Sequence, residues 1–217
     1  MTKQFELPFE KKYNYHYSKI YYLRHKKGFL KLLSNSLEQR MIAKALRLAG
    51  SPKVVLDIPC GAGRFFNTIL NSGTQNMIAA DQSPDMLQVI QEVFPTSTLN
   101  NIKLMQTSIT QIDLPDQSVD TALCIRLIHH IHDKAYRDII YKELRRVARQ
   151  TVCISYWVDG NYKSHREALR AKKTRTLSRC LNRTELEQEL TSAGFSIIDK
   201  VDMCKFLSYW RTYILKI

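Results

Sequence analysis

Several features that would restrict the function are missing from this 217-residue sequence. Its apolar runs all fall short of the ~20 residues that a membrane-spanning helix requires. The first residues contain no apolar core of the kind found in signal peptides. We therefore expect a cytoplasmic protein, either free or peripheral to the inner face of a membrane. Because no repeat, low-complexity segment or linker interrupts the chain, we expect one domain over residues 1–217.

The cysteines lack the spacing of a metal site or a disulfide framework. There are five of them, Cys60, Cys124, Cys153, Cys180 and Cys204, and this odd number is widely spread along the chain. No two form a Cys-x-x-Cys pair or a Cys/His pattern of the kind that binds zinc. The pattern predicts reduced thiols of a cytosolic protein and no metal.

Positive charge, by contrast, is abundant, with a net charge of +13. Residues 1–53 carry 12 basic against 3 acidic side chains, and residues 134–217 carry 18 against 9. Residues 54–133, with 3 against 8, are acidic. Basic flanks around an acidic middle favour an anionic partner: nucleic acid, a membrane surface or an acidic metabolite. Solvated helix faces are the simpler interpretation of the same charges.

The most informative stretch is an apolar run that ends at Asp57, followed by a Pro/Gly turn and by helical spacing over residues 65–70. A strand, a turn and a helix in this order present a ligand at the carboxyl edge of an α/β sheet. A dinucleotide site would require a third glycine after Gly61 and Gly63, but Phe66 occupies that position. The carboxylate of Asp57 would also repel a pyrophosphate. Both observations disfavour NAD.

The same residues suit a ligand that carries an amino-acid end and a ribose. Asp57 suits an ammonium group, and the N–H groups at the start of the following helix suit a carboxylate. Asp81 closes a second apolar run, residues 77–80, where an acid can accept hydrogen bonds from two ribose hydroxyls. S-adenosyl-L-methionine (SAM) matches this description better than NAD. An ordinary buried turn without a ligand is the simpler alternative.

Three motifs together resemble those of class I SAM-dependent methyltransferases, in the type 11-like, broad group around the quinone-biosynthesis methyltransferases. They are residues 56–64 (LDIPCGAGR), Asp81 and residues 114–120 (LPDQSVD). The resemblance covers about residues 50–155. It implies a Rossmann-like α/β fold: a seven-stranded, mostly parallel sheet with an antiparallel last strand and helices on both faces.

The resemblance also implies SAM as the cofactor and a set of residues that bind it. Pro59 stands where the family has the first glycine of its turn, and Ser108 stands where the family usually has an acid near the adenine amino group. Arg126 is expected to hold either the methionine carboxylate or an anion of the substrate. The complete set of expected cofactor-binding residues is Asp57, Pro59, Gly61, Gly63, Arg64, Asp81, Gln82, Ser108, Ile109 and Arg126.

Candidate catalytic residues follow the expected fourth strand, residues 120–125. His129 and His130 would lie beside the transferred methyl group, and a histidine can take a proton from an attacking hydroxyl or amine near neutral pH. On a helix the two side chains point about 100° apart, so at most one faces the pocket. Helix packing is the simpler role. The fifth strand ends at Tyr156 and Trp157, which are able to line a planar substrate pocket.

The resemblance implies that both flanking segments cover the substrate. The expected N-terminal lid, residues 1–48, is rich in tyrosine and basic residues, and Tyr17 and Tyr21 are its substrate candidates; stacking on RNA bases or packing on the domain are alternatives. The expected cap is an insertion at residues 160–183, which has eight cations and one acid. Its substrate candidates, for an anionic acceptor, are Arg166 and Arg170.

We therefore expect an enzyme that transfers a methyl group from SAM to a small-molecule or lipid-like, anionic acceptor. In one form of this hypothesis, the enzyme meets the acceptor at an anionic membrane surface. An RNA methyltransferase is the alternative, favoured by the charge, although no N-P-P-[YFW] motif is present. A SAM-binding partner protein without activity is the third hypothesis.

Overall fold

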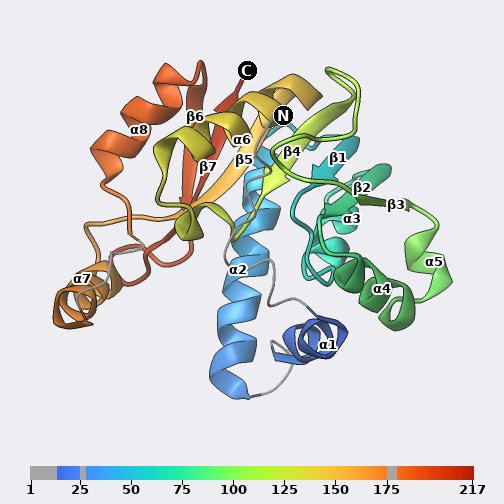
Figure 1. Cartoon of the computed structure of the whole chain (residues 1–217), viewed down its shortest axis with the longest axis horizontal. Coiled ribbons are helices and arrows are strands. Elements are labelled where there is room, and N and C mark those ends of the chain that lie inside the picture. Colours follow the sequence, from blue (N-terminus) through green and yellow to red (C-terminus); the bar gives the residue numbers. More distant parts are fainter. Residues whose placement is uncertain (1–13, 25–27, 175–179) are drawn as a thin grey trace, which may run out of the picture.

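Seven strands form one sheet in the computed structural model, which describes residues 14–24, 28–174 and 180–217. The strand order is β3-β2-β1-β4-β5-β7-β6, and helices cover both faces (Figure 1). Strands β1 to β5 pair in parallel, whereas β7 runs antiparallel to both of its neighbours, β5 and β6. The expected Rossmann-like, mostly parallel sheet with an antiparallel last strand is confirmed.

The apolar runs of the sequence become the strands. Their bounds are Val54–Asp57 (β1), Asn76–Asp81 (β2), Ile102–Gln106 (β3), Val119–Cys124 (β4), Ala148–Trp157 (β5), Ser196–Asp202 (β6) and Trp210–Lys216 (β7). The helices are Tyr15–Arg24 (α1), Phe29–Leu48 (α2), Phe66–Asn71 (α3), Pro84–Val93 (α4), Thr96–Leu99 (α5), Lys134–Val147 (α6), Tyr162–Thr174 (α7) and Arg183–Ser192 (α8), with a short 3₁₀ helix, η2, at Ile128–His130.

The central strands are buried on both faces, as expected for a parallel sheet between helices. One apolar cluster packs Ile140 and Leu144 of α6 and Leu190 of α8 against the sheet. The other cluster packs α2 and α3, through residues such as Met41 and Ile69, against the opposite face. Because β1 to β4 are parallel, their carboxyl ends meet at one edge, where the chain leaves each strand through a loop.

The flanking segments lie near this edge. In the lid expected at residues 1–48, residues 1–13 and 25–27 fall outside the described part. Helix α1 contacts α4 through a hydrogen bond from Tyr15 Oη to Glu92 Oε2 (2.6 Å). In the expected cap, residues 175–179 fall outside the described part, and α7 projects away from the sheet (Figure 1). No helix among the described residues is long and apolar enough to span a bilayer.

The turn after β1 depends on glycine at position 63. Gly63 has a φ of +76°, in the left-handed region that side chains disfavour. A Cβ there would lie 2.7 Å from Cε2 of Phe94 and 2.9 Å from Cε2 of Phe66. The third glycine of a dinucleotide site is thus replaced by a ring, Phe66, that packs directly on this turn.

We expect Gly63→Ala to lower the free energy of unfolding by about 3 kcal/mol, because it adds both a left-handed alanine and an overlap with two rings. Gly50→Ala is the matched control, since Gly50 has a φ of +91° but no atom within 4 Å of its added Cβ. It should cost only about 1 kcal/mol. Equal losses for the two variants in urea unfolding would contradict the proposed ring contact.

Candidate cofactor and acceptor site

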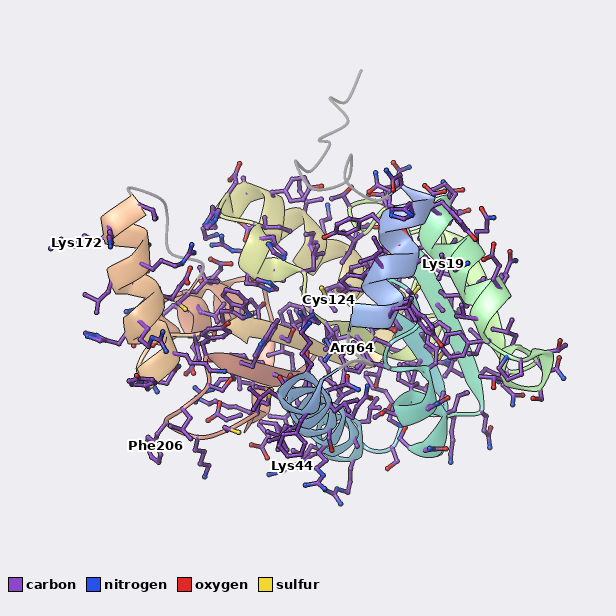
Figure 2. All side chains as sticks on the ribbon, turned by 90° about the horizontal axis from the view of Figure 1, so that it is seen from below. Lys19, Lys44, Arg64, Cys124, Lys172 and Phe206 are labelled. Carbon is purple, nitrogen blue, oxygen red and sulfur yellow. The ribbon has the colours of Figure 1, made fainter. Side chains whose placement is uncertain are left out.

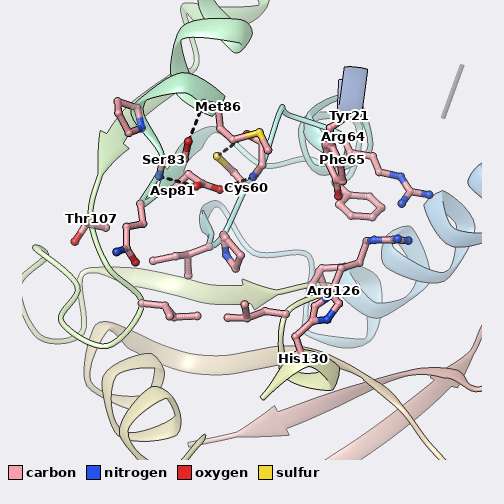
Figure 3. A pocket seen from close by; sticks show the side chains of 18 residues that line it. Tyr21, Cys60, Arg64, Phe65, Asp81, Ser83, Met86, Thr107, Arg126 and His130 are labelled. Carbon is pink, nitrogen blue, oxygen red and sulfur yellow. Dashed lines mark hydrogen bonds between the residues drawn. The ribbon is translucent and has the colours of Figure 1, made fainter. Parts of the chain in front are cut away.

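A cavity of about 290 Å³ opens at the carboxyl ends of β1, β2 and β4 (Figure 3). Its wall combines the turn after β1, the loop after β3, η2 and α1. The lining residues are Tyr21, Ile58, Pro59, Cys60, Gly61, Arg64, Phe65, Asp81, Gln82, Ser83, Pro84, Met86, Thr107, Ile109, Ile125, Arg126, Leu127 and His130. Seven of the ten residues expected to bind the cofactor are among them: Pro59, Gly61, Arg64, Asp81, Gln82, Ile109 and Arg126.

Acidic side chains converge at the ends of β1 and β2. The carboxylate of Asp57 is buried, with 1% of the residue exposed, and neither of its oxygens has a hydrogen-bond partner among the described residues. Burial, and secondarily the charge of Asp81, raise the pKa of Asp57 to about 8. A buried carboxyl without a donor is costly, so this position favours a ligand that supplies a cation.

Asp81 ends β2 and lines the cavity. Burial raises its pKa above the ordinary value, although two N–H donors oppose the shift. They are the amides of Gly61, 2.8 Å from Oδ2, and of Ser83, 2.9 Å from Oδ1. These bonds connect the glycine turn to the second strand. Since a carboxylate has about four acceptor positions, Asp81 can still accept from a ligand.

A buried carboxylate of α2 joins two arginines at the other end of the cavity. Glu38, 1% exposed, accepts from Arg64 Nη2 at 2.5 Å and, through both oxygens, from Arg126 Nη1 at 3.1 Å. Figure 3 shows Arg64 and Arg126 on the same side of the cavity as Tyr21. Two guanidinium groups around one carboxylate leave one net positive charge, which makes this end suitable for an anion.

Arg64 is not saturated by these bonds. Its side chain is 10% exposed, and its Nη1 is buried without a hydrogen-bond partner among the residues described. Burial lowers its pKa, although Glu38 opposes the shift. Burial also acts against the charge of Arg126, but Glu38 and Tyr21 outweigh it and raise that pKa. The open donor of Arg64 is the counterpart of the open carboxylate of Asp57.

The two candidate histidines occupy different places. His130 lines the cavity. His129 is buried behind it and stacks on Trp157, with ring centroids 4.4 Å apart and planes 12° apart. The segment is the 3₁₀ helix η2 rather than an α-helix, and the two imidazole centroids lie 4.0 Å from each other. Only His130 is therefore placed to meet a ligand directly.

Three residues expected at the cofactor are not part of the cavity wall. Asp57 is buried and precedes the lining residue Ile58 in the chain. Gly63 packs against rings instead. The hydroxyl of Ser108 lies 2.8 Å from Oγ1 of Thr110, and its neighbour Thr107 takes the place at the cavity.

The substrate candidates are also separated by the structure. Tyr21 lines the cavity, and its Cε1 would lie 3.6 Å from a Cβ on Gly61, whereas Tyr17 is outside the cavity wall. Tyr156 is completely buried, with its hydroxyl donating to Tyr141 Oη at 3.0 Å. Trp157 stacks on His129. Arg166 and Arg170 lie on α7, outside the cavity wall, and Arg170 is paired with Glu167 at 2.7 Å.

Glu38 is the residue that sequence reasoning missed. It lies in α2 three, four and seven residues before the buried Met41, Ile42 and Ala45, so it belongs to the apolar stripe of that helix. An acid on such a stripe is a detectable signal, because an isolated charge there would be costly. Phe65 and Met86 carried no comparable signal, since apolar residues at those positions are expected in any core.

Comparison with known proteins agrees with this architecture. A family model described as a methyltransferase domain matches residues 55–151, the part that contains β1 to β4 and both acidic strand ends. This match supports the expected class I SAM-dependent methyltransferase. A curated relative, an uncharacterized methyltransferase-like protein of Schizosaccharomyces pombe, is 31% identical over 98 residues, which are 45% of this chain and 36% of the relative. The chain thus spans about a third of that relative.

Solved structures share the methyltransferase fold at low sequence identity. Magnesium protoporphyrin IX methyltransferase from Synechocystis, with bound SAH, has a TM-score of 0.66 and 16% identity, over 88% of this chain and 87% of that one. The 1,6-didemethyltoxoflavin-N1-methyltransferase of Burkholderia thailandensis has a TM-score of 0.64 and 19% identity, over 100% of this chain and 92% of that one.

Asp57 should make the ligand-free protein less stable as the pH rises. Its pKa is about 8 when folded against 3.8 when unfolded, so the folded state binds more protons between these values, and stability falls from about pH 4 toward pH 8. Asp57→Asn removes this dependence. We expect its melting temperature, relative to the natural protein, to be higher at pH 8 than at pH 5. A difference that is constant with pH would contradict the assignment.

Glu38→Gln should destabilise the fold strongly, because it leaves two guanidinium groups close together without their shared counter-charge. We expect a loss of about 3 kcal/mol in the free energy of unfolding. Asp138→Asn, which breaks the exposed pair with Lys134 (2.8 Å), is the matched control and should cost less than about 1 kcal/mol. Similar losses for the two variants would show that the buried bridge contributes no more to the free energy of unfolding than an exposed ion pair.

Proposed function

We propose that this protein transfers a methyl group from SAM to a small-molecule acceptor bound beside His130. The observation that carries the proposal is a pair of buried groups beside the cavity that lack a hydrogen-bond partner among the described residues: the carboxyl group of Asp57, behind the wall, and Nη1 of Arg64, which lines it. Each of them needs a partner from outside the chain. The amino-acid end of SAM supplies an ammonium group for the first and a carboxylate for the second.

The remaining wall suits the adenosine part. Asp81, held by the amides of Gly61 and Ser83, has acceptor capacity for the ribose hydroxyls. Ile109 and Met86 provide apolar surface for the adenine, and Gln82 provides polar contacts at the same end. The donor set therefore fits SAM along its whole length, with acids toward the ribose and the ammonium and cations toward the carboxylate.

Bound SAM would supply a methyl group on a positively charged sulfur. The chain's own contribution is to hold the acceptor atom about 3–3.5 Å from that methyl group and in line with the breaking bond. Tyr21, Phe65 and Leu127 line the same cavity as His130. The imidazole of His130 can accept a proton from a hydroxyl or amine of the acceptor.

A small-molecule acceptor is supported by two solved enzymes that share this fold. The Burkholderia enzyme binds 1,6-didemethyltoxoflavin, and the Synechocystis enzyme is a magnesium protoporphyrin IX methyltransferase. Both relatives therefore support a small acceptor on this fold, although neither identifies the acceptor of this chain.

The proposal predicts transfer of label from [methyl-³H]SAM into the small-molecule or lipid fraction of a cell extract, treated in parallel with RNA and protein fractions. His130→Ala should reduce the rate by about 10²-fold or more if the imidazole takes the proton. Label that appears in the RNA fraction would contradict the proposed acceptor class.

Calorimetry with SAM provides the control that separates an enzyme from a SAM-binding partner protein. Asp57→Asn should weaken binding about tenfold or more, because it removes a charge-assisted bond, while Asp138→Asn should leave binding unchanged. Binding without any labelled product would favour the partner protein. Unchanged affinity of Asp57→Asn would refute the ammonium site.

A further inference from the structure

The outer face of α7 combines large apolar side chains with cations. Tyr162, Arg166, Leu169 and Lys173 follow one another at spacings of four, three and four residues, so they share one side of the helix. Tyr162 is 59% exposed and Leu169 is 57% exposed. Because Ser164 and Ala171 bury the opposite side, this apolar and basic face is turned away from the domain.

The loop between β6 and β7 extends this face. Phe206 is 81% exposed and Leu207 is 61% exposed. The amide of Tyr162 donates to the carbonyl oxygen of Phe206 at 2.9 Å, and the amide of Lys163 donates to that of Leu207 at 3.3 Å. The loop is therefore fixed beside the first turn of α7. Figure 2 shows Phe206 and Lys172, another α7 residue, on the same outer side of the molecule.

Phe206 is held in an unfavourable backbone conformation while its ring is exposed. Its φ is +62°, which is rare for a bulky residue, and no burial of the ring compensates for the strain. A partner outside the domain would bury the ring that the chain itself leaves exposed. Together, Tyr162, Arg166, Leu169, Lys173, Phe206 and Leu207 are called the docking face.

We propose that the docking face binds the surface of an anionic lipid bilayer. Its Leu and aromatic side chains would enter the boundary of the acyl region, and Arg166 and Lys173 would lie at the level of anionic head groups. Neither cation forms an ion pair with another residue in the described part of the chain, so both are available to the lipid. Tyr162 and Phe206 would suit either RNA bases or a bilayer, whereas the exposed Leu169 and Leu207 offer no stacking surface and favour the bilayer.

The docking face is connected to the cavity by a row of rings. Lys163 follows Tyr162 of the docking face in α7, and its Nζ lies 5.9 Å from the ring centre of Tyr209. The ring of Tyr209 lies 4.2 Å from that of Trp157. Trp157 stacks on His129, whose ring is 4.0 Å from that of His130 at the cavity. A bilayer at the docking face would thus lie at the same edge of the sheet as the proposed acceptor site. The docking proposal itself does not depend on the methyl transfer.

Vesicle sedimentation tests the proposal. The protein is mixed with vesicles of phosphatidylcholine alone or with phosphatidylglycerol added, in about 0.1 M salt, where surface charges are partly screened. We expect binding to the anionic vesicles only. The double reversal Arg166→Glu with Lys173→Glu should weaken binding by about tenfold or more. Phe206→Ser with Leu207→Ser, which changes no charge, should weaken it to a similar extent.

The matched control reverses two exposed cations elsewhere, Lys44→Glu with Lys142→Glu, and gives the same change in net charge. It should alter vesicle binding less than about twofold. Equal loss in both charge reversals would mean that only the overall charge matters, and it would overturn the proposal. An absence of vesicle binding would also overturn the proposal. The same holds if the docking-face variants lose tRNA binding or self-association while their binding to vesicles is unchanged.

Discussion

The bridge from Glu38 to Arg64 and Arg126 is the interaction on which the rest of the site depends. Glu38 belongs to α2, Arg64 to the turn after β1 and Arg126 to the loop after β4, so one carboxylate connects a helix to two strand ends. Arg126 adopts a φ of +67°, and its amide donates to Ser155 Oγ of β5 at 2.8 Å. A buried charge cluster is costly to assemble, so its retention at a cavity wall indicates a role in ligand binding.

The cavity separates opposite charges along its length, and this separation has a price in stability. Asp57 and Asp81 are both buried with raised pKa values, and at the opposite end Nη1 of Arg64 has no hydrogen-bond partner in the described part of the chain. A fold selected for stability alone would pair these groups or replace them with apolar residues. The chain instead keeps both sites unsatisfied until a ligand with matching charges is bound. Stability and ligand recognition oppose each other at the same atoms.

Local patterns made the strands, the glycine turn and most of the cavity predictable, because apolar runs and turn residues act over a few positions. Features that depend on three-dimensional packing were not predictable. Ser108 turns to its neighbour Thr110, so Thr107 reaches the cavity instead. Side chains alternate along a strand, so Tyr156 and Trp157 point to opposite faces, and Tyr156 meets Tyr141 of α6. The partners of Glu38 become visible only once α2 is placed across the sheet edge.

The packing also explains where the excess of positive charge is concentrated. Most arginines of the basic carboxyl-terminal part that face the domain are neutralised by acids: Arg137 by Glu189, Arg146 by Glu143 and Asp116, and Arg211 by Asp202. Arg166 and Lys173 on the outer face of α7, by contrast, form no ion pair with any other described residue. The acidic middle of the sequence contains the proposed SAM site, whereas Arg166 and Lys173 lie beside the exposed apolar side chains of the docking face. If the docking face binds a bilayer as proposed, an acceptor with a lipid tail would be able to move from that bilayer toward His130 without complete exposure to water.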